Sequence, residues 1–163
     1  MEREVRYCTT DDGVRIAYTV SGSGPALLVL PTQFESFALA LEIPEWRSFQ
    51  ARLSEGYTRI DYDGRGVGLS EREITGLSLE AQVLDVEAVL RAAKTNSVSI
   101  WAWGASAPRA LAFAARRPAQ VRSLVLYGAY ARAKDALPEK TIRDLTAFAR
   151  LNWPMAARAM SGA

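Results

Sequence analysis

Short apolar runs alternate along this chain with longer segments in which apolar residues recur every three or four positions. The first two runs, Glu4–Thr9 and Val14–Val20, are strand-like, and Asp11-Asp12-Gly13 between them is typical of a hairpin turn. Ala26–Leu30 is apolar throughout, as expected for a strand that is buried on both faces. Three further runs are predicted to be strands: Tyr57–Tyr62, Val98–Trp103 and Val121–Tyr127.

Helical periodicity fills most of the intervals between these strands. One helix is predicted to begin near Pro44, since proline favours the first helical turn. Ser78 is a good N-cap for a second helix, whose apolar residues fall on one face. Two more helices are predicted over Pro108–Arg117, where Pro118 ends the helix, and over about 138–152.

The order of elements is a hairpin followed by repeated strand–helix units. Such a pattern predicts an α/β fold: a three-layer arrangement around a mostly parallel sheet, with an antiparallel hairpin at its N-terminal end. We divide the chain into a core over residues 1–135 and a helical segment over residues 136–163.

Composition narrows the functional classes. The chain has 163 residues, of which 49% are hydrophobic and 23% charged, values typical of a folded globular domain. A net charge of +2 with scattered arginines does not indicate a nucleic-acid partner. One cysteine, Cys8, permits neither an intramolecular disulfide nor a cysteine metal cluster, and we expect no metal and no cofactor. The sequence shows neither a signal peptide nor a membrane-spanning stretch, so we expect a cytoplasmic protein without a membrane partner.

Candidate chemistry is concentrated where the strand Val98–Trp103 ends. The small residues Gly104-Ala105-Ser106 follow that strand and precede a helix, which is the layout of a nucleophile elbow. Ser106 is the candidate nucleophile, and the backbone N–H of Ala107 is its candidate oxyanion donor. A second donor is expected from Thr32 or Gln33, in the loop after Ala26–Leu30. The alternative for that loop is an ordinary strand end.

The sequence contains no histidine. A serine hydroxyl is a poor nucleophile until a base accepts its proton, and that base is usually histidine. No homo-oligomer of this chain can therefore assemble a Ser-His-Asp triad. Asp135 follows the strand that ends at Tyr127, but without a histidine to orient it is expected to be a surface residue.

The glycine-rich segment Asp61–Ser70 invites a phosphate-binding interpretation. It lacks a Gly-Lys-Ser/Thr sequence, and no GxGxxG motif opens directly into a helix. We therefore interpret it as a structural loop that is held by Asp63 and Arg65.

These motifs, in this order, resemble the N-terminal half of the α/β-hydrolase fold family. The resemblance rests on four segments: 12–18, 63–70, 104–106 and 121–128. A closer similarity, carried by Pro44-Glu45-Trp46, residues 127–132 and Asn152-Trp153, is to a subgroup fused to bacterial adenylate cyclases or helix-turn-helix regulators. The resemblance implies that residues 136–163 begin a cap domain and that the acid and the histidine come from later segments.

Two functions remain open. One is a serine hydrolase lineage acting on esters or other acyl compounds, with Ser106 as nucleophile and weak or no activity in this chain. The other is a non-catalytic module of a regulatory protein that binds a small acyl or ester ligand or serves assembly. We also expect a homodimer, formed through the exposed edge of Val121–Tyr127 or through the C-terminal helices.

Overall fold

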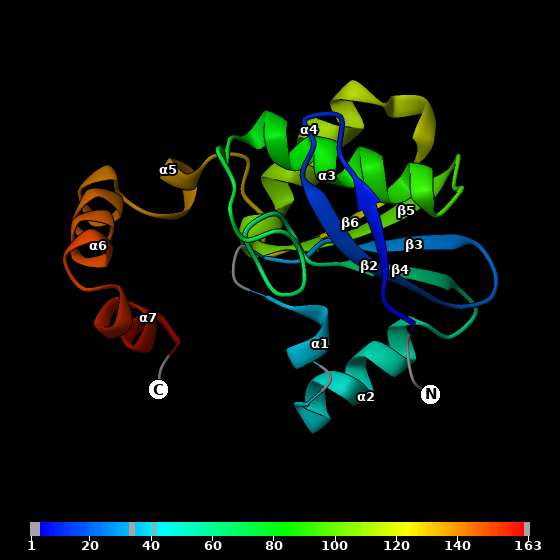
Figure 1. The fold of residues 1–163 in the computed structure, drawn as a ribbon, viewed down its shortest axis with the longest axis horizontal. Helices are drawn as coiled ribbons and strands as arrows, with labels where there is room; N and C mark the ends of the chain where they lie inside the picture. Colours follow the sequence, from blue (N-terminus) through cyan, green and yellow to red (C-terminus); the bar gives the residue numbers. More distant parts are fainter. Residues whose placement is uncertain (1–3, 33–34, 41, 162–163) are drawn as a thin grey trace. The chain divides into compact units, whose positions relative to one another are not determined.

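A six-stranded sheet organises the N-terminal part of the chain (Figure 1). The computed structural model describes residues 4–32, 35–40 and 42–161. Within them the strands lie in the order β1-β2-β4-β3-β5-β6. β1 pairs antiparallel with β2 and β2 with β4, whereas β4, β3, β5 and β6 are mutually parallel. The strands are β1 Arg6–Thr9, β2 Arg15–Gly22, β3 Ala26–Val29, β4 Thr58–Tyr62, β5 Val98–Trp103 and β6 Val121–Tyr127.

Helices cover both faces of this sheet, which confirms the predicted three-layer α/β fold with its antiparallel hairpin. α3 (Leu79–Ala92) and α4 (Ala107–Arg116) lie on one face, and α1 (Phe37–Ala40) and α2 (Pro44–Leu53) lie on the other (Figure 1). The main core is built between the sheet and the α3–α4 layer. Its members are mostly aliphatic and include Ile16, Leu28, Ile60, Val86, Val89, Ile100 and Phe113.

Alternation along β5 assigns its side chains to the two faces. Val98, Ile100 and Ala102 are buried towards the core, while the intervening residues are only partly buried. Trp101 and Trp103 are two of these, and they contact Phe49 and Trp46 of α2 with ring centroids 5.6 and 5.1 Å apart. The side chains of β5 therefore pack against the helices on both faces of the sheet.

The chain divides into two compact units, residues 1–129 and 130–163. The second unit contains α5 (Ala133–Ala136), α6 (Glu139–Leu151) and α7 (Trp153–Ser161). The assignment of residues 136–163 to the start of a cap domain stays a prediction. In the described part of the chain, no helix is long and apolar enough to cross a membrane.

The loop after β4 is held by Asp63 and Arg65, as the sequence predicts. The Asp63 carboxylate accepts hydrogen bonds from the backbone N–H groups of Phe37 and Leu69, each at 2.8 Å, and from the hydroxyl of Ser36 at 3.2 Å. Gly68 has a φ of +54°, and a Cβ there would collide with the Asp63 carboxylate, so only glycine fits. The glycines of this loop thus serve a tight turn around a carboxylate.

Candidate active site

The sharpest change of direction near the predicted elbow lies at Gly104. β5 ends at Trp103, and Gly104 has a φ of +47°, in the left-handed region that glycine adopts without strain. A single 3₁₀ turn, η1 (Gly104–Ser106), then leads into α4 at Ala107. Ser106 is already helical, with φ −83° and ψ −16°.

The hydroxyl of Ser106 is directed back into this turn. Its Oγ accepts a hydrogen bond from the backbone N–H of Trp103 and donates one to the carbonyl oxygen of Trp103, both at 2.9 Å. Ser106 is fully buried, with a relative exposure of 0%. The side chain predicted to be the nucleophile therefore caps the backbone of the turn in this structure.

The predicted oxyanion donors are also engaged. The N–H of Ala107 donates to the carbonyl oxygen of Gly104, and Ala107 is fully buried. The N–H of Thr32 donates to the Glu35 carboxylate at 2.7 Å. Gln33 lies outside the described residues. In this conformation neither Thr32 nor Ala107 offers its N–H to a substrate oxygen.

A residue that the sequence analysis did not single out connects these two segments. The buried guanidinium of Arg109, in the first turns of α4, donates to the carbonyl oxygen of Pro31 at 3.2 Å and to the Tyr62 hydroxyl at 2.8 Å. Its Nε has no partner among the described residues. Arg109 thereby ties the loop after β3 and the end of β4 to α4. The signal in the sequence was an arginine on an otherwise apolar helix face.

Burial sets the ionisation behaviour of the groups around these loops. Burial raises the pKa of the Tyr62 hydroxyl, although the positive charge of Arg109 opposes the effect. Burial also raises the pKa of Asp63, against its hydrogen bonds from Leu69, Phe37 and Ser36. The pKa of Cys8 is raised to about 11, chiefly by burial, so its thiol is protonated at neutral pH.

Asp135, the acidic residue considered for a triad, lies in the second unit. It accepts hydrogen bonds from the side chain and the backbone of Arg132, and this pairing lowers its pKa. Among the described residues, no group of three or more His, Cys, Asp and Glu side chains is placed to hold a metal ion.

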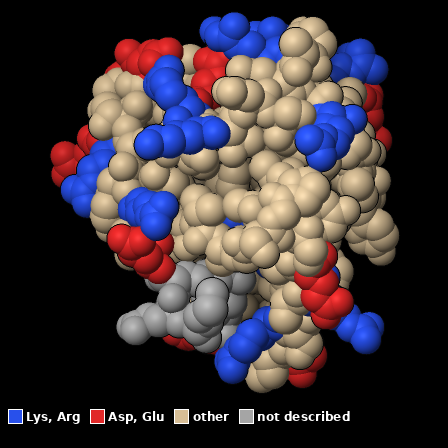
Figure 2. Space-filling view, turned by 90° about the vertical axis from the view of Figure 1, so that its right-hand side faces the viewer, with Lys and Arg blue, Asp and Glu red and all other residues tan. Residues whose placement is uncertain are grey.

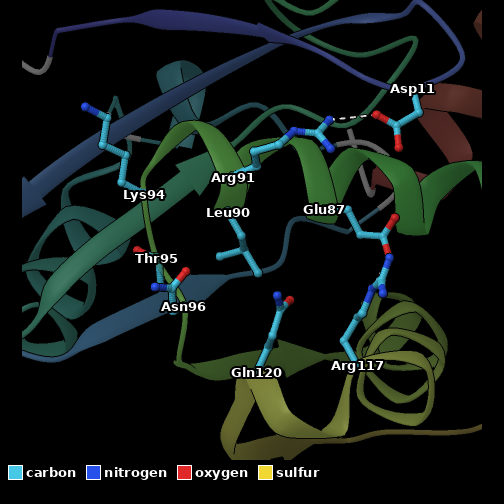
Figure 3. Close-up of a pocket in the computed structure, with 9 residues that line it drawn as sticks. All are labelled: Asp11, Glu87, Leu90, Arg91, Lys94, Thr95, Asn96, Arg117 and Gln120. Carbon is cyan, nitrogen blue, oxygen red and sulfur yellow. Dashed lines mark hydrogen bonds and ion pairs between the residues drawn. The ribbon is translucent and has the colours of Figure 1, made fainter.

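A polar cavity of about 380 Å³ lies beside the C-terminal end of α3 (Figure 3). Two ion pairs line it, Arg91 with Asp11 and Arg117 with Glu87, each at 2.8 Å, and Lys94 adds a further positive charge. None of the predicted site residues within the described ranges lines it. On the face in Figure 2, basic and acidic side chains are interspersed, so that face carries no basic stripe.

A second cavity, of about 430 Å³, is apolar and lies over β5 and β6. The register pairs Trp101 with Val125 and Trp103 with Tyr127, so these four side chains share one face of the sheet. Tyr127 is 72% exposed and Val125 51%. We call this surface the aromatic face; its lining residues are Trp46, Phe49, Trp101, Trp103, Val125, Leu126 and Tyr127.

Comparison with known proteins relates the chain to hydrolases. No family model matches the sequence. Serine hydrolase BPHL of Homo sapiens is 28% identical over 141 residues, which cover 83% of this chain and 47% of that protein. The protein of the same name in Mus musculus gives the same identity and coverage. The chain spans about half the length of the curated relatives it matches.

Solved structures share the same architecture. The esterase RhEst1 from Rhodococcus sp. ECU1013 is 26% identical with a TM-score of 0.68, over 78% of this chain and 46% of that protein. The epoxide hydrolase CorEH matches 99% of this chain and 56% of its own length, with 24% identity and a TM-score of 0.72. At that lower identity the likeness concerns the fold alone.

Proposed function

Because this chain adopts part of the α/β-hydrolase fold, we propose that it is a non-catalytic module of the serine hydrolase lineage. In this proposal it binds a small acyl or ester ligand or a second copy of itself, as part of a cytoplasmic regulatory protein. It does not hydrolyse esters by itself.

One observation carries the proposal: the hydroxyl of Ser106 is buried and bonded at both ends to the backbone of Trp103. Attack on a carbonyl carbon would require this hydroxyl to leave both bonds, reach solvent and lose its proton to a base. The 163 residues contain no histidine to act as that base. The engaged N–H groups of Ala107 and Thr32 support the same conclusion, because an oxyanion would find neither donor free.

The relatives support the lineage and not the activity. One is named a serine hydrolase and one an esterase, and the chain covers less than half the length of each. Those names describe proteins more than twice as long as the part that this chain matches. We use them only as support for the origin of the fold.

The test is the hydrolysis of p-nitrophenyl acetate by the purified chain, measured beside its Ser106→Ala variant. We expect neither protein to hydrolyse the ester faster than a buffer that contains an inert protein at the same concentration. Ser48→Ala is a matched control, because Ser48 is an exposed serine whose hydroxyl also bonds a backbone carbonyl, that of Pro44. Turnover that is lost in Ser106→Ala and kept in Ser48→Ala would overturn the proposal.

Folding of the Ser106→Ala variant must be checked in the same experiment. The substitution removes two hydrogen bonds of the turn and should cost about 1–2 kcal/mol of stability. Circular dichroism and a urea titration distinguish a folded, inactive variant from an unfolded one.

A further inference from the structure

We infer that Gly104, and not Ser106, occupies the position from which a hydrolase of this fold presents its nucleophile. The inference deepens the proposed function, on which it rests: it identifies the side chain whose loss leaves the site inactive. The nucleophile position is then empty because glycine has no side chain, while the backbone around it is retained.

The backbone carries the first argument. A nucleophile elbow is a strained turn placed directly between a strand and the following helix. The pairing of β5 with β6 continues to Trp103 opposite Tyr127, so Gly104 is the first residue beyond the strand. Its φ of +47° lies in the left-handed region, which strains every residue except glycine and which such a turn requires, whereas Ser106 has ordinary helical angles.

Space around the two positions carries the second argument. Among the described residues, a Cβ built on Gly104 meets no atom within 4 Å apart from its chain neighbours, so a side chain there would project into open space. Positive φ alone does not produce this opening. Gly68 has a similar φ of +54°, and its Cβ would strike the Asp63 carboxylate. Ser106, in contrast, is completely buried.

The oxyanion donors carry the third argument. In this fold the residue after the nucleophile supplies one backbone N–H to the oxyanion. If Gly104 holds the nucleophile position, that residue is Ala105. Ala105 is exposed, and its N–H has no hydrogen-bond partner among the described residues. The N–H of Ala107, which would serve Ser106, is instead bonded to the Gly104 carbonyl.

Cysteine substitution tests the inference directly. In a Cys8→Ala background, Gly104→Cys and Ser106→Cys variants are treated with N-ethylmaleimide at pH 7, and modification is followed by mass spectrometry. We expect Gly104→Cys to react roughly tenfold faster or more than Ser106→Cys, since a buried thiol reacts only when the turn opens. The chain without substitutions is a further control, because the thiol of Cys8, with a pKa of about 11, should react slowly.

Equal rates for the two variants, or a faster Ser106→Cys, would overturn the inference. Either result is distinct from failure of the proposed function, which appears as Ser106-dependent ester turnover in the chain without cysteine substitutions.

A second pair of variants keeps the test decisive if Gly104→Cys does not fold. Gly104→Ala and Gly68→Ala introduce the same methyl group at similar φ values. We expect Gly104→Ala to lower the melting temperature less than Gly68→Ala, since only the second methyl collides with a neighbour. A larger loss at Gly104 would show that its surroundings are closed and would overturn the inference.

Discussion

Arg65 controls the ionisation of Asp12. From this ion pair we predict how the free energy of unfolding changes as the pH falls. Arg65 donates to both carboxylate oxygens of Asp12, at 2.7 and 3.0 Å, and these bonds hold the pKa of Asp12 at about 2. An unfolded aspartate has a pKa of about 3.9, so between these values the unfolded chain binds the extra proton. The contribution of the pair is therefore complete above about pH 4 and is lost as the pH falls towards 2.

Urea unfolding of the chain and of Asp12→Asn between pH 5 and pH 2 measures this contribution. We expect the chain to be more stable than the variant at pH 5, and the two stabilities to converge as the pH falls. A constant difference across the range would contradict the assigned pKa of Asp12.

At the residue scale, the sequence allowed some roles to be predicted and obscured others. Asp63 and Arg65 could be assigned to the loop because both lie in the glycine-rich turn, where an aspartate side chain commonly bonds nearby backbone groups. The nucleophile position of the elbow was harder to predict. Gly104-Ala105-Ser106 consists of small residues, so either Gly104 or Ser106 fits that position by size. The predicted strand ends at Trp103, but the only hydroxyl in the triplet directed the prediction to Ser106 and not to Gly104. The direction of the Ser106 hydroxyl depends on the backbone angles at Gly104, which no residue pattern specifies.

At the scale of elements, Arg65 joins three segments that are far apart in sequence. Besides Asp12 in the β1–β2 turn, it bonds Asp85 of α3 through its Nε, at 2.9 Å, and through its backbone N–H, at 3.2 Å. The Asp85 side chain is 0% exposed and that of Arg65 is 2%. Arg65→Met leaves the Asp85 carboxylate buried without its partner, and we expect it to cost about 3–5 kcal/mol in urea unfolding.

Two variants give that prediction its controls. Adding Asp85→Leu to Arg65→Met removes the buried charge and should recover most of the loss. Arg91→Met breaks an exposed ion pair with Asp11 and should cost less than about 1 kcal/mol. Equal losses for Arg65→Met and Arg91→Met would show that burial of the Asp85 pair is energetically unimportant.

The longer elements were predictable because each has its own periodicity. β5 and β6 have the predicted bounds, and α2 begins at Pro44 as expected. The four-residue helices α1 and α5 were not predicted, since one turn of helix has no periodic signal and depends on its surroundings. α1 illustrates the point: the N–H of Phe37, its first residue, is bonded to the Asp63 carboxylate, 26 positions away in sequence.

At the scale of the molecule, the sequence predicted the layers and the parallel sheet. The structure shows in addition which strand forms the exposed edge of that sheet. Among the described residues β6 pairs only with β5, so its other side presents unpaired backbone groups. Natural edge strands are commonly protected by charges, prolines or bulges, and Arg122 is the single charged residue in β6. The aromatic face continues to this edge through Val125 and Tyr127.

These features favour a second copy of the chain as the partner of β6. An antiparallel pairing centred on Leu124 is symmetric and places Arg122 opposite Leu126 and Ser123 opposite Val125 of the other copy. No like charges face each other in this register, because the two Arg122 residues are four positions apart along the strands. The two aromatic faces then lie on the same side of one continuous sheet.

Light scattering coupled to gel filtration tests this dimer, and Val125→Lys tests its interface. The substitution places two lysines about 7–8 Å apart across the symmetry axis and should shift the chain to monomers. Leu151→Lys adds the same charge at an exposed leucine of α6 and should leave the dimer intact. Dissociation by Leu151→Lys alone would assign the interface to the C-terminal helices, and a chain that is monomeric at all concentrations would refute the dimer.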